Sequence, residues 1–143
     1  MKRSQLLLGL VPLLWLACSS STQSGAIAEL VSEDGDVLLT VEVERLQTEA
    51  EWMQGLRGRD SLEVSHGILL DFQEPSEICI HNQGVSFSID ALFFDAEELL
   101  VAIERSLPAG DSEYRCHDET RRVLELQGGL AREAWLGSRL LLR

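Results

Sequence analysis

The chain has 143 residues, 45% of them hydrophobic, and carries 24 acidic against 12 basic side chains, a formal net charge of −12. This length supports one folded domain of ordinary size but not two. An acidic surface of this kind repels nucleic acid and anionic lipid headgroups, so we expect neither as a direct partner of the folded part.

The first residues have the layout of a bacterial export signal. Lys2 and Arg3 precede an apolar run from Leu6 to Ala17, which is too short to span a bilayer permanently. Cys18 follows at once, so the region resembles a bacterial lipoprotein box in which a signal peptide, residues 1–17, is removed and the cysteine is lipidated. The alternatives are cleavage near Ala17 without a lipid, which gives a soluble periplasmic or secreted protein, and an uncleaved N-terminal anchor.

We therefore expect a protein of the bacterial cell envelope that a lipid holds on the periplasmic side of a membrane. Residues 18–25 comprise the cysteine and a small polar linker, and residues 26–143 form the domain. Removing residues 1–17 leaves 10 basic against 24 acidic residues, a net charge of −14. Attachment then depends on the lipid and not on a basic patch.

A short helix is predicted near the start of the domain. Thr48 and Glu51 form a capping-box pattern, and the helical spacing continues to about Arg57. Trp52 and Met53 lie at this spacing, and we expect both in the core because apolar residues on one helix face usually pack inward.

The rest of the domain reads as short strands. Two apolar runs around the acidic turn at Glu33–Asp36 predict a hairpin, and "AEE" at 96–98 predicts another. A polar stretch from Leu107 to Asp118 predicts the longest loop, and Leu130–Trp135 a second short helix. The fold class is α+β, a mostly antiparallel β domain with two short helices. Further strands are predicted at Gly67–Phe72, Ile78–Asn82, Phe87–Asp95, Leu99–Arg105, Arg122–Gln127 and residues 139–142.

Four blocks occur in order along the domain: "GLRGRDSL", "HGILLDF", "IHNQGVSFSIDALFFD" and "RVLELQGGLAREAWLG". With these blocks the chain resembles the domain-of-unknown-function-192 family of bacteria and archaea, over roughly residues 41–142. The resemblance implies a compact, barrel-like β-rich domain that is often exported, and it supplies no catalytic residues. Departures from the family pattern are Asn82–Gln83, Ser88 and Gly137–Ser138. Matching positions are Ile80, His81, Gly84, Phe87, Ile89, Asp90, Phe93 and Asp95.

Two cysteines and two histidines invite three interpretations. In an oxidising compartment Cys79 and Cys116 can pair as a disulfide. Together with His81 and His117 they could instead bind zinc, although adjacent residues on a strand point to opposite faces. A cysteine activated by either histidine would make an enzyme, but the acidic surroundings raise the pKa of a thiol and oppose this reading.

Polar residues within the family blocks suggest a binding face. If they converge, they could line a shallow pocket in which an arginine recognises a carboxylate or a sugar hydroxyl. Each could also have a structural role, such as capping a turn or a helix end. The candidate ligand-binding residues are Arg57, Arg59, His81, Asn82 and Asp90.

The sequence thus favours a binding or accessory module of the envelope that is not an enzyme and uses no cofactor or metal. Its expected partners are a membrane, through the lipid, and an unknown envelope protein or small polar ligand. A small enzyme or metal site built on Cys79, His81 and His117 is one alternative. A purely structural envelope component is the other.

Overall fold

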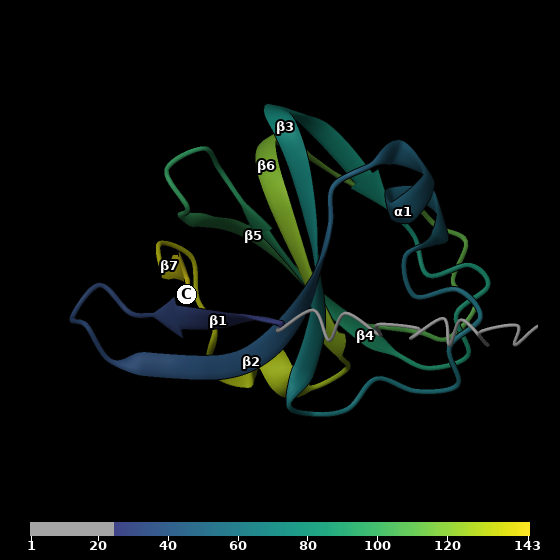
Figure 1. Cartoon of the computed structure of the whole chain (residues 1–143), viewed down its shortest axis with the longest axis horizontal. Helices are drawn as coiled ribbons and strands as arrows, with labels where there is room; N and C mark the ends of the chain where they lie inside the picture. The colour runs from purple at the N-terminus through teal and green to yellow at the C-terminus, as the bar shows by residue number, and fades with distance from the viewer. Residues whose placement is uncertain (1–24) are drawn as a thin grey trace, which may run out of the picture.

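The computed structural model describes residues 25–143, which form one curled seven-stranded sheet (Figure 1). The predicted signal peptide, Cys18 and nearly all of the predicted linker lie outside the described residues. Among residues 25–143, no helix is both long and apolar enough to cross a membrane. The elements are β1 Ala26–Val31, β2 Val37–Leu46, α1 Glu49–Gln54, β3 His66–Ile80, β4 Ile89–Phe94, β5 Leu100–Leu107, β6 Arg115–Gln127, the 3-10 helix η1 Leu130–Glu133 and β7 Arg139–Leu142.

The strand order is β5-β4-β6-β3-β2-β1-β7, and every pair is antiparallel except β2 with β3. A parallel pair cannot be joined by a tight turn, so residues 47–65 form a crossover connection that carries α1. The two edge strands then meet, because Leu99 pairs with Arg139 and the Leu100 amide donates to the Ser138 carbonyl at 2.8 Å. The sheet is therefore a half-barrel, which confirms the predicted barrel-like, mostly antiparallel fold.

Both faces of the central strands are buried. Leu92 and Phe94 of β4 point into the barrel, whereas Ala91 and Phe93 join a second apolar cluster on the outside of the sheet. Figure 1 shows α1 and the loops around it on the side of the molecule away from β1 and β7. Because α1 and the following loop supply Trp52 and buried Leu56 to the outer cluster, they cover this part of the outer face.

The helix is shorter than predicted. Its capping box is present, since the Thr48 hydroxyl accepts from the Glu51 amide and the Glu51 carboxylate accepts from the Thr48 amide. It ends at Gln54 because Gly55 leaves the helical conformation, with φ of 47°. The prediction that Met53 lies in the core is wrong: its side chain is 68% exposed, and only Trp52 of this pair packs against the outer cluster.

Two strands are longer than predicted. β3 joins the two predicted strands at 67–72 and 78–82, and β6 starts at Arg115, inside the predicted loop. Pro75 falls in the irregular stretch of the β3–β6 register, where a residue without an amide hydrogen is tolerated. Beyond that irregularity the two strands continue as a ribbon. A disulfide joins Cys79 to Cys116 across this ribbon, directly opposite in register with 4.0 Å between the Cα atoms.

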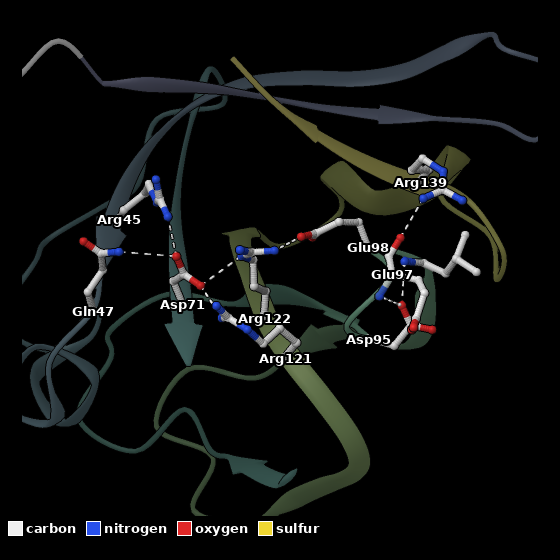
Figure 2. A network of polar contacts seen from close by, with 10 residues as sticks. Arg45, Gln47, Asp71, Asp95, Glu97, Glu98, Arg121, Arg122 and Arg139 are labelled. Atoms are coloured by element: carbon white, nitrogen blue, oxygen red, sulfur yellow. Dashed lines mark hydrogen bonds and ion pairs between the residues drawn. The ribbon is translucent and has the colours of Figure 1, made fainter. Parts of the chain in front are cut away.

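A buried carboxylate ties three strands together at the start of that ribbon (Figure 2). Asp71 of β3 is 4% exposed and accepts from Arg45 of β2 and from Arg121 and Arg122 of β6, the last at 2.9 Å. Arg122 also pairs with Glu98 in the β4–β5 turn. Burial alone would raise the pKa of Asp71, but the hydrogen bond from Arg45 and the charges of Arg122 and Arg121 hold it below its ordinary value.

Changing Cys79 to serine should lower the thermal unfolding midpoint under oxidising conditions. The bridge closes a loop with a sequence separation of 37, and loop entropy of this size stabilises the fold by about 4 kcal/mol, or roughly 10–20 °C. In dithiothreitol the variant and the wild type should unfold together. A loss of the same size in both conditions would mean that packing, and not the bridge, was removed.

Replacing Asp71 with asparagine should cost on the order of 3 kcal/mol in urea unfolding at pH 7, because it leaves three arginines around an uncharged group. The folded pKa of Asp71 is depressed, so its contribution is present above the ordinary value of 3.8 and is lost as the pH falls through the folded value. The gap between variant and wild type should therefore close in acid. Glu44→Gln, which removes an exposed partner of Arg59, should cost less than about 1 kcal/mol.

Candidate functional site

A cavity of about 550 Å³ lies between α1, the loops that follow α1 and β3, and the outer faces of β3 and β6. This volume is within the range of sites that bind small molecules. Its walls are mostly apolar, from Trp52, Leu56, Leu70, Phe72, Ile78, Ile80, Val85 and Ile89. Its polar and charged lining comes from Arg57, Glu77, His81, Asn82, Tyr114 and Glu125, and Cys79 of the disulfide also contributes.

Trp52 links the helix to the sheet at one wall of the cavity. Its indole nitrogen donates to the Leu46 carbonyl at 2.8 Å, at the end of β2. Its ring lies 4.7 Å from that of Phe72 on β3, in a tilted arrangement. The crossover connection is therefore tied to both strands of the parallel pair, and the two aromatic rings form an apolar part of the cavity wall.

Glu125 brings a carboxylate into apolar surroundings. It is on β6, in register with Ile68 on one neighbouring strand and Ala91 on the other, and is 7% exposed. No donor among residues 25–143 forms a hydrogen bond or ion pair with its side chain. Burial raises the pKa of Glu125 to about 7, and the positive charge of Arg57 opposes the rise.

Arg57 is held by backbone groups and not by an acid. Its Nε donates to the Gln83 carbonyl at 3.1 Å and its Nη1 to the Met53 carbonyl. Gly84, at a φ of +82°, packs against the arginine stem, and a Cβ there would come within 3.4 Å of it. No carboxylate among the described residues lies within ion-pair distance of Arg57. The guanidinium is thus fixed in place with its charge unneutralised.

His81 completes the polar side of the cavity. Its Nδ1 lies 3.1 Å from the Gln83 amide nitrogen, and its Nε2 lies 3.2 Å from Nη2 of Arg57. Burial and the charge of Arg57 both lower the pKa of His81, which keeps the ring neutral. A neutral imidazole has one acceptor nitrogen, so the ring can accept from the Gln83 amide or from Arg57 but not from both.

The structure brings three of the five predicted ligand-binding residues to the cavity, namely Arg57, His81 and Asn82. Asn82 is 1% exposed and its amide nitrogen donates to the carbonyls of Phe87 at 2.9 Å and Pro108 at 2.8 Å, which fixes the loop. Its buried Oδ1 has no partner among residues 25–143.

The other two predicted residues lie elsewhere. Asp90 is fully buried and accepts from the amides of Ser106, Gly129 and Ala131 at 2.7–2.9 Å, so it joins β5 to the start of η1. Arg59 pairs with Glu44 at 2.6 Å, outside the cavity lining.

Cys79 and Cys116 form a disulfide, which does not agree with the enzyme and zinc interpretations. Within residues 25–143 both cysteines are in the disulfide, so neither offers a thiolate for attack or for zinc. His117 lies 2.8 Å from a Glu104 oxygen and packs edge-on against Phe93, outside the cavity lining. In this part of the chain no group of three or more His, Cys, Asp or Glu side chains could hold a metal ion.

Sequence reasoning missed Glu125 and Tyr114, and it assigned Trp52 only to the core. A signal for Glu125 was available, because "VLELQ" places a charged residue inside an apolar run on a strand long enough to be buried on both faces. Nothing local marked Tyr114, whose ring lies 4.9 Å from that of His81 only because the β3–β6 ribbon brings them together.

Comparison with known proteins gives a family and a fold. The DUF192 family, described as Uncharacterized ACR, matches residues 30–140. A Sinorhizobium meliloti 1021 protein, whose description proposes a transcription regulator, has a crystal structure with a TM-score of 0.78 at 22% identity, over 82% of this chain and 92% of that one. A Novosphingobium aromaticivorans DSM 12444 protein of unknown function has a TM-score of 0.72 at 22% identity, over 80% and 83%. A search of curated proteins found no match.

Changing Glu125 to glutamine should stabilise the protein in a pH-dependent way. The folded pKa of about 7 exceeds the ordinary 4.5, so wild-type stability falls as the pH rises between these values. Above pH 7 the full penalty is on the order of 3 kcal/mol. Urea unfolding should show the variant more stable at pH 8 and the difference much smaller near pH 4.5. The control is Glu119→Gln, an exposed position on the same strand, and an equal pH slope in wild type and Glu125→Gln would contradict the prediction.

Proposed function

The chain belongs to the DUF192 family, and we propose that it is a non-catalytic binding module of the bacterial cell envelope. In this proposal the cavity between α1, β3 and β6 takes up a small ligand. The domain is tethered to the periplasmic side of a membrane by a lipid on Cys18, through the linker at residues 18–25.

The observation that carries the binding proposal is that a carboxyl group and a guanidinium line one cavity without forming an ion pair. Among residues 25–143, Glu125 is buried without a hydrogen-bond partner, and Arg57 is held by carbonyl groups and not by an acid. Leaving a buried charge without a partner costs free energy, and a fold can avoid this cost by using an apolar residue at the same place. A ligand that pairs with both groups gives a physical reason for their presence, and perturbed titratable groups in a cavity are typical of functional sites.

Binding is favoured over chemistry by the state of the candidate nucleophiles. Both cysteines of the described region are oxidised to a disulfide, and His117 is engaged with Glu104. Of the candidate ligand-binding residues, Arg57, His81 and Asn82 line the cavity, whereas Arg59 and Asp90 do not. The regulator description of the Sinorhizobium protein is a statement about that protein, and the net charge of −12 argues against a nucleic-acid partner here.

A second candidate function is acid–base catalysis by Glu125. A carboxyl group with a pKa of about 7 can both hold and release a proton at neutral pH, which suits a general acid or base. Neutral His81 in the same lining could orient a substrate carbonyl. This candidate differs from the binding module in that the bound molecule would change its mass with time.

The test is native mass spectrometry of the full chain extracted from its own envelope. We expect a mass that includes a lipid, lacks two hydrogens for the disulfide and carries a small-molecule adduct. Ile78→Trp, which places a large ring in the cavity wall, should remove the adduct, whereas Val101→Trp on exposed β5 should retain it. Absence of any adduct from the wild type would overturn the binding module.

The same spectra test the anchor. Cys18→Ala should lose the lipid mass and move the protein to the soluble fraction while the adduct is kept. Continued membrane fractionation of Cys18→Ala would show that an unprocessed signal segment, and not a lipid, anchors the chain. An adduct whose mass changes on incubation in the wild type but not in Glu125→Gln would favour the enzyme.

A further inference from the structure

The polar groups of the cavity differ in hydrogen-bonding character at two places, with donors at one and an acceptor at the other. Near the loop after β3, Arg57 and His81 offer N–H donors and one positive charge. On the sheet surface, Glu125 offers a carboxylate without a donor. We infer that the ligand is a small monocarboxylic acid with an apolar body and a hydroxyl or amino group, an inference that rests on the proposed binding function.

The carboxylate belongs between Arg57 and His81. If the imidazole proton is on Nε2, it faces Nη2 of Arg57 at 3.2 Å, and an oxygen atom placed beside both would accept from each. If the proton is on Nδ1, Nε2 instead accepts from Nη2 of Arg57, and the exposed Gln83 amide loses its acceptor on the ring. The arginine needs no rearrangement, because Nε and Nη1 are already fixed by carbonyls.

The single positive charge at this end of the cavity favours a ligand group with one negative charge. Neutral His81 adds no charge, so Arg57 alone supplies one positive charge to this end of the cavity. Glu77 also lines the cavity, and the chain as a whole carries a net charge of −12. A doubly charged phosphate would leave one negative charge uncompensated in these surroundings, whereas a carboxylate is matched.

The part of the cavity at Glu125 favours a hydrogen-bond donor on the ligand. The carboxyl group of Glu125 can accept hydrogen bonds, and the side chains of its strand neighbours Ile68 and Ala91 have no donor to offer it. A hydroxyl or an amino group on the ligand would supply the missing donor. The rings of Trp52 and Phe72, with centroids 4.7 Å apart, and the side chain of Ile78 line the same cavity. These surfaces suit an aromatic or branched aliphatic body.

Four related probes separate these requirements in calorimetric titration of the full chain in detergent. They are 3-phenyllactate, phenylalanine, 3-phenylpropionate, which lacks the donor, and 2-phenylethanol, which lacks the carboxylate. Charge-assisted hydrogen bonds are worth about 1.5–3 kcal/mol, so removing either group should weaken binding roughly 10-fold or more. Phenyllactate or phenylalanine should therefore bind at least about 10-fold more tightly than phenylpropionate and than phenylethanol.

Matched variants assign each preference to a residue. Arg57→Gln should weaken the binding of the three acids about 10-fold or more and leave phenylethanol unchanged. The control Arg59→Gln, which removes a nearby arginine outside the cavity, should leave all four affinities unchanged. Glu125→Leu, an apolar replacement that suits its apolar neighbours, should abolish the advantage of phenyllactate and phenylalanine over phenylpropionate.

The outcomes distinguish this inference from the binding proposal. If all four probes bind alike and Ile78→Trp abolishes their binding, the cavity binds ligands but the inferred class is wrong. The class is also wrong if the envelope protein carries an adduct that lacks a carboxylate. If no probe binds and no adduct is found, both proposals fail.

Discussion

The pairing of β3 with β6 holds together parts of the chain that are far apart in sequence. These two long strands lie at the centre of the sheet, and the first half of β3 with the second half of β6 separates the interior of the half-barrel from the outer apolar cluster. The second half of β3 and the first half of β6 leave the barrel as a ribbon that is closed by the disulfide. The cavity needs both parts, since Glu125 comes from the buried half of β6, and Cys79 with its neighbours from the ribbon.

The buried carboxyl groups of β3 and β6 lie in contrasting electrostatic surroundings. Asp71 on β3 is buried among three arginines from two other strands, so its charge is compensated and its pKa is held low (Figure 2). Glu125 on β6 is buried and has no hydrogen-bond partner in the described part of the chain, and burial raises its pKa. In a chain with twice as many acids as bases, three arginines are gathered around one aspartate while Arg57 is left without an acid. The first arrangement stabilises the fold through ion pairs, whereas Arg57 contributes to the fold only through its hydrogen bonds to the Met53 and Gln83 carbonyls.

Much of the secondary structure was predictable because its signals are local. The capping box at Thr48, the hairpin around Glu33–Asp36 and the turn at 96–98 each depend on a few adjacent residues. The boundaries of β3 and β6 were not, because the ribbon residues are polar on their exposed face and become strands only by pairing with each other. The prediction that Met53 is buried was wrong for another reason. The helix has only six residues, which is too short to bury a broad face.

By itself, the sequence determined the strand-rich fold class, the short capped helix and the cysteines that could pair. It also gave five candidate ligand-binding residues, of which Arg57, His81 and Asn82 line the cavity. These follow from residue type, spacing and the compartment implied by the first residues. Only the tertiary structure decided that β2 and β3 run parallel, that Asp90 caps η1, and that Arg57 and Glu125 share one cavity. The reason is physical: register between distant strands sets which side chains meet, and it depends on burial over the whole sheet and not on any single segment.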